Sequence, residues 1–183
     1  MKSFKTRLAT LVSLLITLFT AGICQGESID LNFHDDTTRL TYANYSAKNV
    51  VTDGGILLIN ENNASEQLFH LGISRMSKNV RFGIRGVYTS QGNLDVFALG
   101  LAVNARFYLA QKTHVEIGGY HAPEFISFMD AAGYTELGFR LSFNITTPLD
   151  LYIGYRNIKL NIENSDHKIE LDDDLHLGLK FYF

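Results

Sequence analysis

Cysteine, proline and tryptophan are scarce in this sequence. Its 183 residues include one cysteine, Cys24, two prolines and no tryptophan. If Cys24 leaves with an N-terminal signal, the mature chain has no disulfide. Few prolines suit a chain that is mostly sheet, because proline lacks the N–H group that a central strand needs for pairing. Without tryptophan, the 9 tyrosines and 13 phenylalanines must supply any aromatic side chains at a membrane interface.

Strong positive charge and long apolar runs are also missing. The net charge is −3, so no basic surface indicates nucleic-acid binding, and we expect no nucleic-acid partner. Beyond residue 26, no apolar stretch approaches the roughly 20 residues that a membrane-spanning helix needs. The mean hydropathy of +0.02 fits a β-barrel, in which lipid-facing and lumen-facing residues cancel in any sliding window.

Residues 1–26 have the pattern of a secretory signal peptide. A basic start precedes an apolar run at residues 8–19, which is too short to cross a bilayer as a helix. We expect cleavage after Cys24 or Gly26. Residues 27–183 then form a single domain, long enough for a barrel of about eight to ten strands. Lipidation of Cys24 is the alternative, but Ile23 occupies a position where lipoprotein signals have a small residue.

The C-terminal segment alternates between two faces. One face of residues 175–183 is apolar and consists of Leu175, Leu177, Leu179, Phe181 and Phe183. The other is polar or small and consists of His176, Gly178, Lys180 and Tyr182. This is the pattern of a transmembrane barrel strand, whose apolar face meets lipid while its other face meets the lumen.

Alternation elsewhere predicts an all-β fold, a transmembrane antiparallel up-and-down β-barrel of about ten strands. We expect the strands at residues 28–34, 38–45, 55–61, 67–76, 80–89, 94–109, 113–121, 133–145, 149–162 and 175–183. Eight strands, with the N-terminal hairpin packed differently, is the alternative.

Four segments do not fit simple alternation. Asp53-Gly54-Gly55 has the composition of a turn, which leaves residues 46–53 irregular. The apolar run at residues 56–59 leaves the register of its strand open. Near Asn157 the apolar face changes phase, which indicates a bulge or a strand that leaves the membrane. We interpret residues 163–174 as a long acidic loop.

Connection lengths predict the orientation of the barrel. Bacterial barrels have short periplasmic turns and longer outer loops. The shortest expected connections are at residues 77–79, 111–112 and 146–148, and the longer ones are at 90–93, 125–133 and 163–174. The two sets alternate along the chain, as they should if both termini are periplasmic. Residues 46–53 break this rule.

The inward faces carry charges of both signs. The inward candidates are His70, Arg81, Arg85, Arg106, His114, Glu116, Glu136, Arg140, His176 and Lys180. Side chains fill most of a narrow barrel, so we interpret this set as a plug of ion pairs and hydrogen bonds. Glu116 and Glu136 are expected near Arg106 and Arg140. A narrow polar pore or a proton path is the alternative.

Two further polar sets have residue types that carry chemistry. His121, Glu124 and Ser127 are the types of a hydrolase triad, but positions six apart on an extended strand are about 20 Å apart. Glu170 and the run Asp172-Asp173-Asp174 could bind a divalent cation, but they lack the glycine and the spacing of a calcium loop. We therefore assign no catalytic, cofactor-binding or metal-binding residue, and we do not expect an enzyme.

Seven short motifs follow one another along residues 28–183. They are SIDLNF at 28–33, RLTY at 39–42, GYHAPE at 119–124, YTEL at 134–137, GYR at 154–156, DDD at 172–174 and LHLGLKF at 175–181. In this order and spacing the chain resembles the YfaZ family of proteobacterial outer-membrane proteins. The resemblance implies a small barrel in the bacterial outer membrane and implies no reaction. Phe183 resembles the terminal aromatic residue that the barrel-assembly machinery reads.

The expected partners follow from this interpretation. They are the lipid bilayer with its lipopolysaccharide and, through the strand that ends at Phe183, the barrel-assembly machinery. We expect a monomer. The first functional hypothesis is a structural or surface-interaction barrel with a side-chain-filled lumen. A narrow, porin-like channel is the second, and an outer-membrane enzyme that acts on lipid or peptide is the third.

Overall fold

The computed structural model describes residues 26–46, 49–61, 64–91, 94–162 and 168–183. The expected signal peptide, apart from Gly26, lies outside these residues. The described chain is almost entirely strand. Its long strands are β1 (Glu27–Phe33), β2 (Thr37–Tyr45), β3 (Val50–Glu61), β4 (Ala64–Ser77), β5 (Val80–Gln91), β6 (Leu94–Ala110), β7 (Thr113–Ala122), β9 (Ala131–Thr146), β10 (Leu149–Ile162) and β11 (Lys168–Tyr182). A 3₁₀ turn, η1 (Glu124–Ile126), and a short strand, β8 (Ser127–Met129), lie between β7 and β9.

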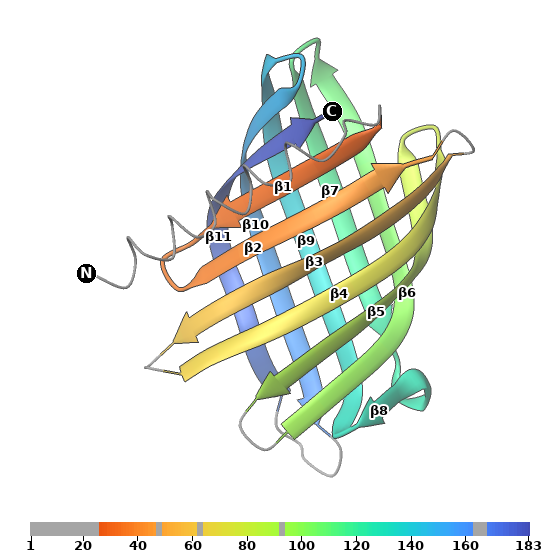
Figure 1. The fold of residues 1–183 in the computed structure, drawn as a ribbon, viewed down its shortest axis with the longest axis vertical. Coiled ribbons are helices and arrows are strands. Elements are labelled where there is room, and N and C mark those ends of the chain that lie inside the picture. Colours follow the sequence, from red (N-terminus) through yellow and green to blue (C-terminus); the bar gives the residue numbers. More distant parts are fainter. Residues whose placement is uncertain (1–25, 47–48, 62–63, 92–93, 163–167) are drawn as a thin grey trace.

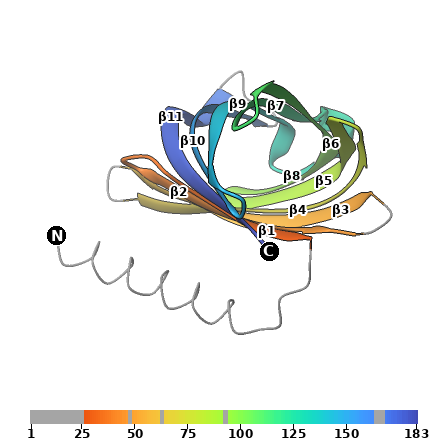
Figure 2. The ribbon, with the colours of Figure 1, turned by 90° about the horizontal axis from the view of Figure 1, so that it is seen from above.

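The ten long strands close into one antiparallel barrel (Figures 1 and 2). Neighbours in the chain are neighbours in the sheet, with β7 paired to β9 and with β1 closing on β11. Leu31 of β1, for example, faces Leu40 on one side and Leu179 on the other. The predicted ten-stranded up-and-down barrel is confirmed, and the eight-stranded alternative is wrong. β8 pairs only with the part of β6 that extends beyond β7.

The two ends of the barrel differ in their connections. Residues 46–49, 78–79, 111–112 and 147–148 connect strands at one end, where Gly26 also pairs with Phe183; we call this the turn end. Residues 34–36, 62–63, 92–93, 123–130 and 163–167 connect strands at the other, the loop end. The longest connection, which contains η1 and β8, is at the loop end.

Apolar side chains cover the middle of the barrel exterior. Leu71 on β4, Leu101 on β6 and Leu177 on β11 are 72 %, 66 % and 61 % exposed. Phenylalanine, leucine and isoleucine continue this surface on β5, β9 and β10. An apolar surface of this extent is unsuited to water, and it is the surface that a bilayer covers in a membrane-spanning barrel. No helix in the described part of the chain is long and apolar enough to cross a membrane.

Two expected connections are parts of strands instead. β3 begins at Val50, so the prediction of a turn at Asp53-Gly54-Gly55 is wrong. Gly55 is required by packing, because a Cβ there would lie 2.4 Å from the Leu40 carbonyl oxygen and 2.6 Å from Cε1 of His70. The β2–β3 connection therefore shortens to residues 46–49, although it remains longer than the β3–β4 and β5–β6 connections at the loop end.

The acidic run at residues 172–174 was also misplaced, because β11 begins at Lys168. Asp172 is buried and pairs with Arg156, while Asp173 is exposed and accepts a hydrogen bond from the Asn157 amide (2.8 Å). Because side chains alternate along a strand, Asp172 faces the lumen while Asp173 faces outward, whereas a loop would have left both in solvent.

The irregular patterns at residues 56–59 and near Asn157 have one cause: the lumen becomes apolar toward the loop end. Leu57 and Ile158 are fully buried inside the barrel. The outward neighbours of Ile158 are polar, whereas those of Leu57, namely Ile56 and Leu58, are apolar, so that β3 is apolar on both faces there. β10 therefore keeps its alternation while the apolar face changes sides, as expected for a strand that leaves the membrane. A register shift against β11 also occurs at Ile158, where Leu171 and Asp172 are both buried.

Candidate functional site in the barrel lumen

The loop end of the lumen is filled by apolar side chains, which we call the apolar plug. Its members come from β3 to β7 and from β9 to β11, so they meet across the barrel. They are Leu57, Ile59, Leu68, Val87, Val96, Ala98, Tyr120, Ala122, Ala131, Tyr134, Ile158, Leu160 and Leu171. Each is at most 6 % exposed. The Tyr120 hydroxyl lies 3.0 Å from the carbonyl oxygens of both Arg85 and Ala98, and its single hydrogen can be donated to either, so even its polar atom is satisfied.

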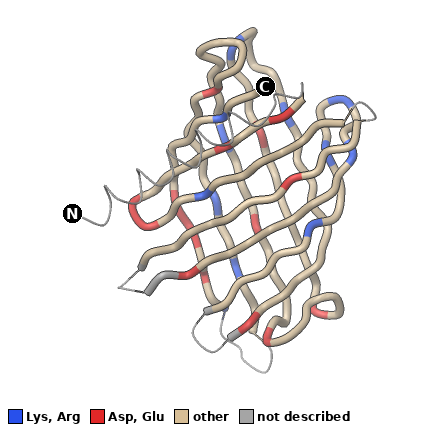
Figure 3. The backbone as a smooth tube through the Cα atoms, viewed as in Figure 1, with Lys and Arg blue, Asp and Glu red and all other residues tan. Residues whose placement is uncertain are grey.

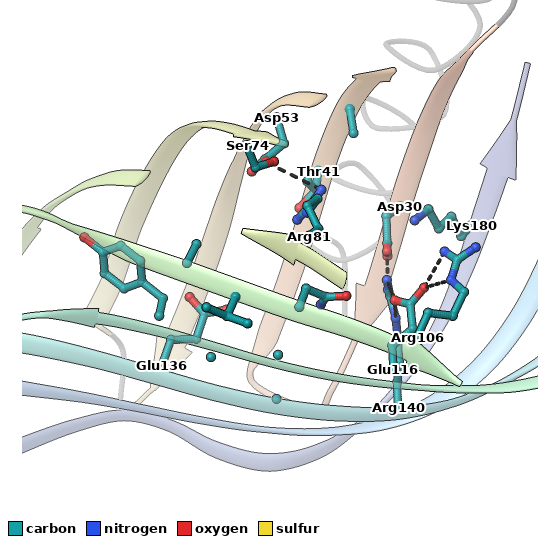
Figure 4. A pocket seen from close by; sticks show the side chains of 18 of the residues that line it. Asp30, Thr41, Asp53, Ser74, Arg81, Arg106, Glu116, Glu136, Arg140 and Lys180 are labelled. Atoms are coloured by element: carbon teal, nitrogen blue, oxygen red, sulfur yellow. Dashed lines mark hydrogen bonds and ion pairs between the residues drawn. The ribbon is translucent and has the colours of Figure 1, made fainter. Parts of the chain in front are cut away.

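Toward the turn end the lumen is charged. Glu116 on β7 lies between Arg106 on β6 and Arg140 on β9, and Arg106 Nε donates to Glu116 Oε1 at 2.6 Å. Arg140 also reaches across the barrel to Asp30 on β1, with Nη1 2.5 Å from Oδ2. Figure 4 shows these four side chains together, and we call them the Glu116 cluster. Asp30 and Glu116 are buried, so each depends on these partners for compensation.

A second group of charges lies on the strands opposite. Glu136 on β9 accepts a hydrogen bond from Arg39 on β2 at 2.5 Å, and Nη1 of Arg85 lies 3.7 Å from its other oxygen. Asp53 on β3 is shared more loosely, with Arg85 Nη2 at 3.4 Å and Arg81 Nη1 at 3.6 Å. These contacts connect β2, β3 and β5 to β9 across the lumen, which ties the two sides of the barrel together.

Tyr152 joins the Glu116 cluster to a third ion pair. Its hydroxyl donates to Asp30 and accepts from Asn32 Nδ2 at 3.1 Å. Asn32 in turn accepts from Arg156 Nη1 at 3.1 Å, and Arg156 Nε donates to Asp172 at 2.7 Å. The buried charges on β1, β10 and β11 therefore form a continuous hydrogen-bonded network.

Lys180 is the exception in this layer. The residue is 7 % exposed, and Asp30 and Asp150 face it from the two neighbouring strands, yet no carboxylate in the described ranges lies within ion-pair distance of its Nζ. Its Nζ lies 3.4 Å from the Tyr45 hydroxyl and 5.1 Å from the centre of the Tyr182 ring. A buried ammonium with such weak partners is unusual, because buried charges are normally paired.

A cavity of about 250 Å³ lies among these charges (Figure 4). Eight lysine and arginine residues line it, against four aspartate and glutamate residues. Its lining includes Lys78 and Asn79 from the β4–β5 turn, so it extends to the turn end. Of the apolar plug, only Tyr120 contributes to the lining. We call this cavity the chamber.

Most of the predicted inward residues line the chamber. They are His70, Arg81, Arg85, Arg106, Glu116, Glu136, Arg140, His176 and Lys180. His114 is buried nearby, with Nε2 3.8 Å from Asp150. Glu116 pairs with Arg106 and Arg140 as expected. Glu136 does not join them, because its partners are Arg39 and Arg85.

The sequence interpretation placed Arg39 inward correctly but missed five buried charges, namely Asp30, Asp53, Asp150, Arg156 and Asp172. Asp53 and Asp172 were assigned to connections, and that error hid them. Asp30 and Asp150 each lie between two apolar neighbours on a predicted strand, and Arg156 follows Asp150 in the same phase, so the inward face of each strand was the signal that would have identified them.

The hydrolase-like set does not assemble. His121 is exposed on β7, with Nδ1 3.0 Å from Thr135 Oγ1. Ser127 Oγ donates to the carbonyl oxygen of Pro123 at 3.0 Å, and Glu124 lies in the exposed 3₁₀ turn. Among the described residues, no group of three or more histidine, cysteine, aspartate or glutamate side chains is arranged to hold a metal ion.

A closed barrel with an apolar exterior and a charged lumen has the architecture of membrane-spanning β-barrel proteins. The family model described as YfaZ precursor matches residues 4–183, nearly the whole chain. The chain therefore belongs to the YfaZ family, as its motifs indicated. A search of curated proteins finds no match.

Several solved structures are similar to this chain. The outer-membrane channel DcaP of Acinetobacter baumannii is 10 % identical, with a TM-score of 0.44 over 84 % of this chain and 54 % of the channel. The NanC porin is 12 % identical, with a TM-score of 0.47 over 86 % of this chain and 100 % of the porin. The KdgM porin, in complex with disordered oligogalacturonate, is 9 % identical, with a TM-score of 0.45 over 86 % and 98 %. The chain spans about half the length of DcaP.

Proposed function

We propose that this protein is a small outer-membrane barrel whose lumen is closed at the loop end. It acts as a structural and surface-interaction protein, not as an open channel. The apolar plug carries this proposal. Leu57, Tyr134 and Ile158 come from three strands and are fully buried, so water and ions have no polar route between them. The chamber is then a blind cavity that opens at the turn end.

The exterior and the connections support the outer-membrane location. Apolar side chains cover the middle of the barrel, and the longest connection is at the loop end. In bacterial barrels the short turns are periplasmic, so the chamber faces the periplasm and the plug faces outward. In this setting the partners are the lipid bilayer, lipopolysaccharide at the loop end, and the barrel-assembly machinery through Phe183.

Planar-bilayer recording of the purified full chain tests the closed lumen. We expect no steady single-channel steps from the wild type. The double variant Leu57→Ser, Leu160→Ser replaces two plug residues that face the lumen from β3 and β10, and it should admit water and produce conductance. The matched control, Leu58→Ser, changes the outward neighbour of Leu57 and should stay silent. Steady steps from the wild type would contradict the proposal.

A narrow channel is the second candidate, and one observation favours it. The chamber is strongly charged and already extends from the turn end to Tyr120. Conduction would require only that the plug rearranges. The same recordings separate the two functions, because a channel lined by excess lysine and arginine conducts anions in preference to cations.

A further inference from the structure

We infer that the chamber is a binding site for a small multivalent anion that carries phosphate or carboxylate groups. Entry from the periplasm rests on the orientation given under the proposed function; the binding itself does not. Three features of the lining carry the inference, namely its charge balance, a buried lysine without a close ion pair, and donors that lack acceptors.

The charge balance of the lining is the reverse of that of the chain. The whole chain has a net charge of −3, whereas lysine and arginine outnumber aspartate and glutamate by eight to four around the chamber. Two further carboxylates are buried behind the lining: Asp172 compensates Arg156, and Asp150 faces Lys180 in the β10–β11 register. Counting both, cations still outnumber carboxylates by eight to six, and Lys78, at the mouth, has no carboxylate partner in the described ranges. Figure 3 shows lysine and arginine in the β4–β5 turn and on the strands behind it. Such a concentration of cations inside low-dielectric walls attracts anions.

Lys180 supplies a donor that the protein does not use fully. An ammonium group has three donors, and the described partner of Lys180 is the Tyr45 hydroxyl at 3.4 Å, which is long for a hydrogen bond. The residue is 93 % buried, since 7 % of it is exposed, and it lines the chamber. An anion in the chamber would give this charge the partner that buried charges normally have.

The opposite wall has unused polar atoms as well. His70 is 5 % exposed, and neither of its ring nitrogens has a hydrogen-bond partner. Arg81 and Arg85 share Asp53 at 3.6 Å and 3.4 Å, and Arg85 Nε has no acceptor. Arg85 also lies 3.7 Å from Glu136, so all of these ion pairs are longer than a charge-assisted hydrogen bond. Donors remain available on this side for a second charged group of the same ligand.

These features define the class of ligand. Guanidinium groups match phosphate and carboxylate oxygens in a fork-like geometry. A cavity of about 250 Å³ is large enough for a small solute. The apolar plug closes the far side, so the ligand enters and leaves at the turn end. Pyrophosphate and citrate have the charge and the size to test the two chemistries.

Isothermal titration calorimetry of the full chain, refolded in detergent at constant ionic strength, measures binding of pyrophosphate and of citrate. We expect saturable one-site binding of at least one, and the ratio of the two affinities tells phosphate from carboxylate preference. Lys180→Gln and Arg81→Gln should each weaken that affinity about tenfold or more. Arg75→Gln, on the exposed outer face of β4, is the matched control and should leave it unchanged. The polycation spermidine should not bind.

A second measurement keeps the test valid if Lys180→Gln does not fold. An amine-reactive reagent is applied to the wild type with and without saturating anion, and mass spectrometry quantifies modification at each lysine. The anion should reduce modification of Lys180 at least about fivefold, because a bound ligand covers the amine. Modification of Lys112 at the β6–β7 turn should not change. The inference would be overturned if neither anion showed saturable binding. It would also be overturned if Lys180→Gln and Arg81→Gln left the affinity unchanged and the anion did not reduce modification of Lys180. Conductance by the wild type would instead contradict the closed lumen and leave anion binding standing.

Discussion

The ring of Tyr152 lies directly over Gly178 on the neighbouring strand. The two residues face each other in the β10–β11 register, and a Cβ on Gly178 would lie 2.2 Å from Cζ of Tyr152. Tyr152 is 3 % exposed, and its hydroxyl contacts Asp30 and Asn32 on β1. Gly178 thus provides the space that lets Tyr152 connect β10 to the strand on the other side of β11.

Gly178→Ala should therefore destabilise the barrel. The added methyl group forces the Tyr152 ring away from Asp30, and overpacking of this kind costs about 1–3 kcal/mol. The free energy of unfolding in urea, measured in lipid vesicles, checks this value. Gly138→Ala is the matched control, because it is also on a barrel strand but its Cβ would meet nothing closer than 3.8 Å. Equal stability of the two variants would contradict the packing described.

Glu116→Gln tests the charge network. The substitution leaves Arg106 and Arg140 without their shared carboxylate in a buried setting, and breaking a buried pair costs about 3–5 kcal/mol. Urea unfolding of the reconstituted protein measures the loss. Adding Arg106→Gln should recover part of it, because one uncompensated charge is removed.

The control for this substitution is Glu170→Gln, which breaks the exposed pair with Lys159 at 3.1 Å. Both of those side chains are about half exposed, so the expected loss is about 0–1 kcal/mol. A loss from Glu116→Gln no larger than this would show that the lumen is solvated enough to tolerate single charges.

Leu68→Ala and Leu71→Ala distinguish the two sides of the β4 wall. Leu68 is 1 % exposed in the apolar plug, so its truncation leaves a cavity and should cost about 2–5 kcal/mol. Leu71 is 72 % exposed on the lipid side, where lipid chains fill the space, and the cost should be about 1 kcal/mol or less. Unfolding midpoints in vesicles compare the two. Equal losses would contradict the assignment of the two faces.

Much of the fold was predictable, because a barrel wall has lipid on one side and a polar lumen on the other. Wherever both conditions hold, as on β4 to β7 and β9, alternation identifies the strands and their inward faces. Glu116 could be paired with Arg106 and Arg140 because they are on adjacent strands in the same phase.

The remainder was not predictable because the lumen is not polar throughout. Near the loop end Leu57 and Ile158 face inward, which inverts the pattern that alternation assumes. Gly55 is a residue type that is typical of turns, but here its lack of a Cβ leaves room for the His70 ring. Contacts across the barrel, such as Arg39 with Glu136, depend on curvature, and strand order alone does not determine them.

Leu101→Arg tests the lipid-facing surface. Leu101 lies midway along β6 and is 66 % exposed, so an arginine there would sit near the middle of the bilayer at a cost of about 2–4 kcal/mol. The yield of assembled barrel in cells should fall. Thr52→Arg, at an exposed polar position on β3, is the control and should assemble normally. Normal assembly of Leu101→Arg would mean that this surface does not meet hydrocarbon.

Heat-modifiable migration on a gel, applied to the chain extracted from purified outer membranes, tests most directly whether every second side chain of the barrel faces lipid. An unheated sample should run as a compact barrel and a boiled sample as the unfolded chain. The chain should require detergent to leave the membrane. Recovery of the processed chain from the periplasm in the absence of detergent, with the same migration before and after boiling, would contradict a membrane-spanning barrel.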